Sequence, residues 1–479
     1  MITTEQVVVE ASETIVEVES LTDSKEFSVF SKIKSVFAGI SEDIREISEE
    51  HNRRSGRRDE VEYSKTNPPY SINNGGKELP LNHHTSPMDA YHHNGKFEYD
   101  IHNLFGHMEA QTTYRSLRKI RPNKRPFILS RSTFPSSGRY VAHWLGDNAS
   151  TWDDLQYSIP GMLSFQLFCI PLTGADICGF SGKCDEKLAM RWVELGSFYP
   201  FCRNHNMFGM PSQEVYTWEA VEKVSKKYIG LRYALLPYWY TAFYRASLRG
   251  TPVLRPLWAS YPEDKETYNI EHQFLIHDGI LISPVVEADK EEVLAYFPRG
   301  IWYDILTLEK YISTEEGVWK TVSAPFDTIP VHIRGGATIP MNLKYGATTV
   351  ETRLNGLMLV VVLDDKFESF GELYLDDGET PTEDISRTYS FITFKTRNNK
   401  LIGNGMFGYY AKEAVLDDIT VIGLDKFDGE AFSKVEGKDR EKIKDDYVKW
   451  DANKKVLRLE RLDLVLTGLF SISWPAAVN

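Results

Sequence analysis

The sequence predicts an α/β region followed by an all-β region. Between about residues 61 and 250, short apolar runs alternate with stretches of helical spacing, which is typical of parallel βαβ units. After about residue 250, short β-like runs such as "DGILISPVV" and "MLVVVLDD" are separated by turn residues. This second pattern indicates one or two antiparallel β domains of the sandwich type.

The α/β region can be divided into elements in chain order. Helical spacing predicts a helix over residues 99–120, and the apolar run "RPFILSR" predicts a strand over residues 125–131. A second short strand, "YVAHWLGD", ends on Asp147. The next two stretches each predict a helix and then a strand, over residues 158–176 and 184–206, and residues 217–250 predict one long helix.

Length, composition and charge limit the kind of protein. The chain has 479 residues, enough for two or three domains with a large core. A net charge of −13 argues against a nucleic-acid partner. No apolar run reaches membrane-spanning length, so we expect no membrane-spanning segment. The amino terminus, "MITTEQVVVEASETIVEVES", lacks a basic start and an apolar core, so we expect no signal peptide in this chain.

The first sixty residues differ in composition from the rest. The first fifty contain twelve acidic and four basic residues, and the basic stretch "RRSGRR" follows. We expect this segment to be loosely packed. The sequence thus predicts four parts: a loose acidic segment (1–60), an α/β domain (61–250) and two β domains (251–345 and 346–479).

Four polar residues stand at the ends of successive predicted strands: Arg131, Asp147, Asp176 and His205. In a parallel β/α barrel the carboxyl ends of the strands converge on one face, which carries the chemistry. A cation, two carboxylates and an imidazole on that face suit a polyhydroxylated substrate. Carboxylates and imidazole bind hydroxyl groups, and one acid can protonate a leaving oxygen.

Each of these residues also has an ordinary structural interpretation. Asp147 could cap a helix, although Ser150-x-x-Asp153 resembles a capping box for the helix that follows. Asp176 could belong to a turn, and His205 could be a loop histidine. One such residue alone would favour the structural interpretation. Four at consecutive strand ends favour a functional site.

A metal site is the other candidate that the sequence raises. "NHHTSPMDAYHHNG" contains the four histidines His83, His84, His92 and His93. Adjacent histidines point apart, and their flanks have a loop composition, so we expect no metal and no cofactor. The cysteines lack metal-ligand spacing, and neither a phosphate loop nor a nucleophile elbow is present.

Several long motifs resemble the α-glucosidases of glycoside hydrolase family 31, of the maltase-glucoamylase type. They include "RSTFPSSGRYVAHWLGDN", "TGADICGF", "FYPFCRNHN", "RYALLPYWYT", "VHIRGGATIP" and "LYLDDGET". The resemblance implies a (β/α)8 barrel followed by proximal and distal β domains, of which this chain has the carboxyl-terminal half of the barrel and both β-sandwich domains. It also implies release of terminal α-linked glucose with retention of configuration, and α-glucosidic oligosaccharides as partners. Such proteins are usually secreted, vacuolar or lysosomal.

The resemblance assigns roles to individual residues. Asp147 matches the general acid/base. Arg131, Asp176 and His205 match residues that hold the sugar, and Trp144 and Phe180 match the aromatic walls beside them.

One expected part is not found in this sequence. The nucleophile of the family is an Asp in a Trp-x-Asp-Met-Asn-Glu motif, and the 479 residues contain no such motif. We also expect residues 1–60 to lie outside the family, because they do not resemble its corresponding part. Two hypotheses follow. The sequence is an incomplete chain of an α-glucosidase, inactive by itself, or it is a non-catalytic descendant that binds a sugar or a protein. The retained acid/base favours the first, because a binding protein has no use for a positioned proton donor.

Overall fold

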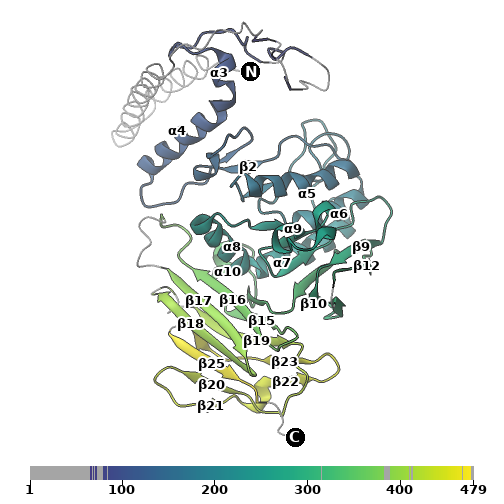
Figure 1. The fold of residues 1–479 in the computed structure, drawn as a ribbon, viewed down its shortest axis with the longest axis vertical. Helices are drawn as coiled ribbons and strands as arrows, with labels where there is room; N and C mark the ends of the chain where they lie inside the picture. The colour runs from purple at the N-terminus through teal and green to yellow at the C-terminus, as the bar shows by residue number, and fades with distance from the viewer. Residues whose placement is uncertain are drawn as a thin grey trace. The chain divides into compact units, whose positions relative to one another are not determined.

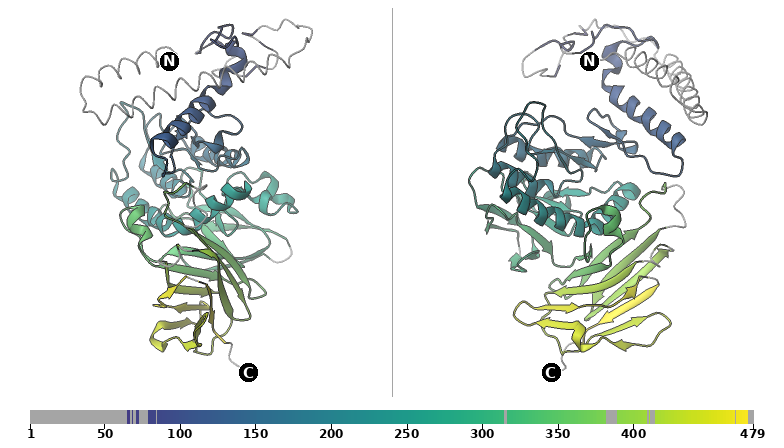
Figure 2. Two further views of the ribbon diagram at one scale, coloured as in Figure 1. Left: turned by 90° about the vertical axis from the view of Figure 1, so that its left-hand side faces the viewer. Right: turned by 180° about the vertical axis from the view of Figure 1, so that it is seen from behind.

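A computed structural model of the chain describes residues 65–66, 68, 71–72, 79–83, 85–313, 316–381, 389–408, 410, 414–466 and 468–475. The predicted loose segment 1–60 and His84 lie outside the described residues. The chain divides into two compact units, residues 1–141 and 142–479. Figures 1 and 2 show the ribbon from three sides.

The described part of the first unit is mainly helical. Its elements are α3 (Glu98–Ile101), η2 (His102–Leu104), α4 (Phe105–Ile120), β1 (Leu129–Ser130) and η3 (Ser137–Arg139). The helix predicted over residues 99–120 therefore forms in three consecutive pieces. The buried carboxylate of Glu98 contacts ring nitrogens of His92 and His102, each at 2.6 Å. The predicted strand over residues 125–131 is only two residues long.

The second unit begins with the predicted strand–helix alternation. Its first elements are β2 (Ala142–Trp144), α5 (Trp152–Leu167), β3 (Thr173–Gly174), β4 (Asp176–Ile177), α6 (Glu186–Gly196) and β5 (Arg203–Asn204). The pairs β2–β3 and β4–β5 are parallel, as predicted. The strands are much shorter than expected, because backbone pairing covers only two or three residues of each. Asp176 opens β4, whereas the sequence placed it at a strand end.

Two local predictions in this region were wrong. Helix α5 is capped by Thr151, whose hydroxyl accepts from the backbone N–H of Asp154 at 3.1 Å, one residue later than the predicted capping box. The predicted long helix is two helices, α7 (Glu219–Ala234) and α8 (Leu236–Arg249), which meet at Leu235. Pro237 explains the break, because proline has no N–H to donate and fits only the first turn of a helix.

The β part of the second unit starts with two facing sheets. One sheet has the order β11-β10-β13-β8-β7-β6, and the other is the pair β12-β9. The strands are β6 (Leu254–Pro256), β7 (Phe274–Ile276), β8 (Ile280–Ile282), β9 (Glu292–Phe297), β10 (Gly300–Asp304), β11 (Lys310–Ser313), β12 (Val318–Ser323) and β13 (Val331–Arg334). All of their pairings are antiparallel.

Strands β7 and β8 are apolar without interruption because both faces of their sheet are buried. Phe274, Ile276, Ile280 and Ile282 belong to the core shared with helices α5 to α8. Leu275 and Leu281 point the other way, into a core shared with the β9–β12 pair. Since successive side chains of a strand alternate between faces, a doubly covered strand has no polar positions.

The carboxyl-terminal part is a second sandwich, drawn in green to yellow in Figure 1. One sheet has the order β14-β15-β19-β23-β22 with β24 beside β19, and the other β16-β17-β18-β25-β20-β21. The strands are β14 (Thr338–Asn342), β15 (Leu357–Val362), β16 (Ser369–Leu375), β17 (Ser390–Arg397), β18 (Lys400–Gly408), β19 (Val415–Ile422), β20 (Phe432–Val435), β21 (Glu441–Lys442), β22 (Val448–Asp451), β23 (Val456–Leu459), β24 (Leu464–Val465) and β25 (Leu469–Ser473). The β15–β19 pair is parallel and the other described pairs are antiparallel. Strand β14 joins this sandwich although it precedes residue 346.

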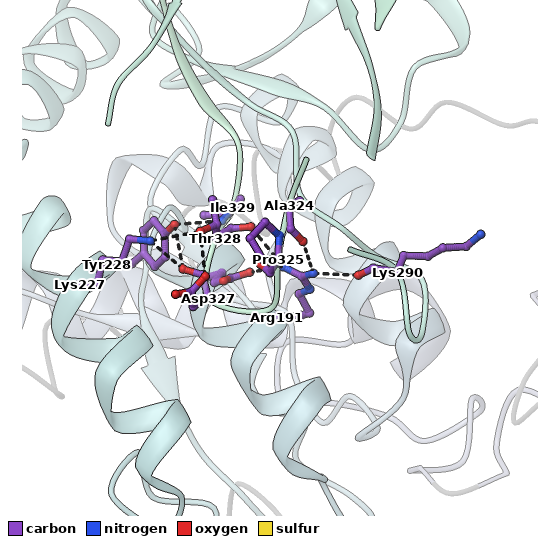
Figure 3. A network of polar contacts seen from close by, with 10 residues as sticks. Arg191, Lys227, Tyr228, Lys290, Ala324, Pro325, Asp327, Thr328 and Ile329 are labelled. Atoms are coloured by element: carbon purple, nitrogen blue, oxygen red, sulfur yellow. Dashed lines mark hydrogen bonds and ion pairs between the residues drawn. The ribbon is translucent and has the colours of Figure 1, made fainter. Parts of the chain in front are cut away.

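A buried arginine connects the α/β part to the β part of the second unit (Figure 3). The Arg191 guanidinium, on α6, donates to the carbonyls of Lys290, Ala324, Pro325 and Thr328 at 2.6–3.2 Å. It also pairs with Glu194 at 3.0 Å. These bonds fix two loops of the β part to one helix.

Candidate active site

The loop after β2 carries Asp147 and is held by backbone hydrogen bonds. The N–H of Leu145 donates to the carbonyl of Gly174 at 3.1 Å, which extends the β2–β3 pairing. Gly146 has a φ of +92°, a backbone conformation that glycine adopts without steric cost, and it turns the chain outward. The Asp147 side chain is consequently exposed at the end of β2.

Asp176 contacts this loop through Asn148 and is fully buried. Its Oδ1 accepts a hydrogen bond from the indole N–H of Trp144 at 2.8 Å. Its Oδ2 has no hydrogen-bond partner among the described residues. Burial raises the pKa of Asp176 to about 6, while the Trp144 hydrogen bond and the Arg203 charge act to lower this pKa and the Asp147 charge acts to raise it. The carboxyl group can therefore still accept a hydrogen bond from a ligand.

His205 follows β5, and its imidazole lies between two aromatic side chains. Its ring centroid is 5.1 Å from that of Phe180 and 6.2 Å from that of Trp144. Burial and the nearby Arg203 guanidinium lower the pKa of His205, while the charge of Asp147 acts to raise it. The imidazole is therefore neutral near pH 7, with one nitrogen able to donate and the other to accept.

The structure thus brings together four of the residues predicted from the sequence, namely Trp144, Asp176, Phe180 and His205. The electrostatic effect of Asp147 on Asp176 and His205 connects it to this group. Arg131 follows β1 in the unit of residues 1–141 and is exposed. Arg131 belongs to the other compact unit than the residues above, and its membership in the site stays a prediction.

Sequence reasoning missed Arg203, whose guanidinium lies over the Trp144 ring at 5.1 Å from its centroid. A signal was present, because the predicted strand ran to His205, and residues two apart in a strand, as Arg203 and His205 are, point to the same face. Sequence reasoning also missed Asn148, whose side-chain amide donates to the backbone carbonyl of Asp176 at 3.1 Å. This bond joins the Asp147 loop to the start of β4.

The arrangement suits a neutral, hydroxylated ligand. A buried carboxyl group and a neutral imidazole offer directional hydrogen bonds, and two aromatic side chains offer apolar faces. Among the described residues, no group of three or more His, Cys, Asp and Glu side chains is placed to hold a metal ion. No helix within the described ranges is long and apolar enough to cross a membrane.

Comparison with known proteins agrees with this picture. Residues 25–242 match the TIM-barrel domain of glycosyl hydrolases family 31, and residues 250–339 match the C-terminal domain of the same family. The first match begins inside the segment 1–60 that the sequence set apart by composition. Together the two matches cover more than half of the chain.

Curated relatives and solved structures point to the same family. A probable alpha-glucosidase of Oryza sativa subsp. japonica is 49% identical over 314 residues, which are 66% of this chain and 35% of that protein. The alpha-glucosidase of Hordeum vulgare is 43% identical over 79% of this chain and 42% of its own length. A crystal structure of a glucosidase II alpha subunit, Tris-bound, has a TM-score of 0.77 and 30% identity, and the match covers 83% of this chain and 44% of that one.

This chain spans well under half the length of these curated relatives. The predicted fold is confirmed: a family 31 TIM-barrel region precedes β domains whose strands are antiparallel except for the β15–β19 pair. The chain belongs to glycoside hydrolase family 31.

Proposed function

We propose that this chain carries the acid/base and part of the glucose-binding site of an α-glucosidase that releases terminal α-linked glucose. One observation carries the proposal. The buried carboxyl group of Asp176, with one oxygen available, lies beside the rings of Trp144, Phe180 and His205 and within the electrostatic influence of Asp147. This combination of hydroxyl-binding and aromatic groups suits the polar rim and apolar faces of a glucose ring.

The reaction follows from the residues and from the family. Asp147 is exposed beside these residues, and the resemblance to the family assigns it the protonation of the leaving oxygen. α-Glucosidic oligosaccharides are the proposed substrates, because the rice and barley relatives are named alpha-glucosidases. Retention requires a second carboxyl group about 5–5.5 Å from the acid/base, as the nucleophile. Since the Trp-x-Asp-Met-Asn-Glu motif is not in this sequence, we expect residues 1–479 alone to be inactive.

The test compares residues 1–479 with a polypeptide extended upstream by a segment that carries the motif. Both are assayed with maltose and with 4-nitrophenyl α-D-glucoside, and the anomer released first is identified by proton NMR. We expect turnover by the extended polypeptide only, with α-glucose as the first product. Release of β-glucose would contradict retention, and Asp147-dependent turnover by residues 1–479 would show that another carboxylate acts as the nucleophile.

Asp147→Ala in the extended polypeptide tests the acid/base role. Maltose hydrolysis should fall by roughly 10²–10⁴-fold, and hydrolysis of the nitrophenyl glucoside much less, because a good leaving group needs little protonation. Added azide should then accelerate the aryl substrate. Asp153→Ala, which removes an exposed carboxylate in the first turn of α5, is the matched control and should change neither rate. Equal losses on both substrates would refute the role of Asp147.

The missing motif favours a second candidate, a non-catalytic descendant that binds a sugar or a protein. This candidate predicts that the extended polypeptide does not hydrolyse maltose; a sugar-binding descendant would still bind maltose, and a protein-binding one would not. The same assay, combined with calorimetric titration of maltose, separates the two.

A further inference from the structure

We infer that Gln213 is a positioning residue that fixes the two loops of the candidate sugar site against each other. The inference rests on the proposed function, because it concerns the same site. Gln213 lies in the segment between β5 and α7 and is 6% exposed. It is not one of the residues that form the walls of the site.

The amide nitrogen of Gln213 reaches both loops. It donates to the backbone carbonyl of Gly179 at 2.9 Å, in the loop after β4. It also lies 3.1 Å from the backbone carbonyl of His205 and 3.1 Å from Oδ1 of Asn204, at the end of β5. In return, the side-chain amide of Asn204 donates to the backbone carbonyl of Gln213 at 2.9 Å. One buried side chain thus joins both strand ends.

This connection replaces backbone pairing where the strands stop. The β4–β5 pair consists of only two residue pairs, the last being Ile177 with Asn204. Beyond it, Cys178 and Gly179 have φ values of +73° and +79°, so their backbone leaves the extended conformation. A Cβ at Gly179 would lie 2.5 Å from backbone atoms of Ser150, so the loop packs closely against the Ser150 backbone and needs glycine at this position. The carbonyl of the buried Gly179 then needs another donor, because a buried carbonyl is costly when unsatisfied.

The bonds of Gln213 determine the spacing between two walls of the site, the rings of Phe180 and His205. Phe180 directly follows Gly179, and His205 is held through its own carbonyl. The Gln213 amide therefore sets the 5.1 Å separation of the Phe180 and His205 rings. A second hydrogen bond joins the same two loops, from the N–H of Met207 to the carbonyl of Phe180 at 2.9 Å. It does not satisfy the carbonyl of Gly179, which is bonded by Gln213. Groups held in this way need no ordering when a sugar binds.

The chain offers a matched control in Gln166, which is 3% exposed at the end of α5. Its Nε2 donates to the carbonyl of Pro171 at 3.1 Å, and its Oε1 accepts from the N–H groups of Val253 and Leu254 at 3.0 and 3.1 Å. Gln166 is as buried and as strongly bonded as Gln213, but it does not contact the site loops.

The experiment compares Gln213→Met and Gln166→Met in residues 1–479. Hydrogen exchange by mass spectrometry follows peptides 174–182 and 203–209, and calorimetry follows binding of 1-deoxynojirimycin, a glucose-shaped iminosugar. In Gln213→Met both peptides should exchange about 10-fold faster or more, and the affinity should fall about 10-fold or more. In Gln166→Met both readings should stay near those of the unsubstituted chain, with faster exchange around residues 251–255 instead.

The outcomes separate this inference from the proposed function. Failure of the unsubstituted chain to bind the iminosugar counts against the proposed function, while the exchange pattern still decides whether Gln213 fixes the loops. Equal behaviour of the two variants, or faster exchange with unchanged affinity, would overturn the inference. If Gln213→Met does not fold, Gln213→Glu keeps the side-chain length and replaces the donor with an oxygen, so it should give the same loop pattern.

Discussion

Two regions of the second unit each contain a buried carboxyl group, yet their surroundings differ. Glu194 contacts the Arg191 guanidinium at the connection to the β part, and Asp176 contacts the Trp144 indole at the candidate site. Burial raises the pKa of both groups, that of Glu194 to about 8 and that of Asp176 to about 6. Each keeps one oxygen without a hydrogen-bond partner among the described residues.

An oxygen without a partner therefore does not by itself mark a binding site. Glu194 lies in a fully packed region, where the Arg191 side chain is 0% exposed and its guanidinium is bonded to four carbonyls. Asp176 instead borders the exposed Asp147 and the half-buried ring of His205. The comparison teaches that a buried polar atom indicates function where it borders a surface open to solvent, and indicates structure where packing encloses it.

The largest effect should come from breaking the enclosed region. Arg191→Met would leave four carbonyls without a donor and Glu194 without its partner, so we expect a loss of roughly 3–5 kcal/mol in the free energy of unfolding. Chemical denaturation measures this loss. Lys187→Met is the control, because it removes a cation from the same helix. The ion pair of Lys187 with Asp289 is exposed, so its loss should leave the unfolding transition unchanged. Similar transitions for the two variants would refute the structural role of Arg191.

Asp176→Asn should act in the opposite direction on stability. Folding raises the pKa of Asp176 from 3.8 to about 6, so the folded state binds its proton more tightly than the unfolded state does, and stability falls as pH rises through this window. Above it, the buried charge costs up to about 3 kcal/mol, which an uncharged Asn would relieve. We expect Asp176→Asn to be more stable at pH 7.5, to lose this advantage towards pH 4, and to bind methyl α-D-glucoside poorly.

Chemical unfolding at pH 7.5 and pH 4.5, together with calorimetry, measures these changes. Asp153→Asn, at an exposed position, should change neither stability nor binding. A variant that is less stable at pH 7.5, or a difference that does not depend on pH, would contradict this account of Asp176.

The sequence predicted the order of the fold, and together with the family resemblance it named Trp144, Asp176, Phe180 and His205 as site residues, but it did not predict the bonds that hold the site. The alternation of strands and helices is a local sequence pattern, so it could be predicted for the region that precedes residue 250. Gln213 follows His205 by eight residues in a stretch without periodicity, and only the tertiary structure shows that its amide spans two loops. Pro237 indicated the helix break at Leu235, but the helical spacing on both sides of it led to the prediction of one continuous helix.

The smallest expected effect concerns the protonation of Asp176 in sugar binding. Ionised, the carboxylate accepts hydrogen bonds from sugar hydroxyls; protonated, it loses much of this capacity. His205, whose pKa is lowered, stays neutral and does not compensate. The affinity of residues 1–479 for methyl α-D-glucoside, which is uncharged over this range, should therefore fall about 10-fold between pH 7 and pH 5, with a midpoint near the pKa of about 6.

Trp144→Phe removes a hydrogen bond that lowers the pKa of Asp176, so the midpoint of the affinity profile should move to higher pH even if the affinity is weaker at every pH. Calorimetric titration across this pH range measures both profiles. An affinity that is constant or increases towards pH 5 would show that a group other than Asp176 controls binding.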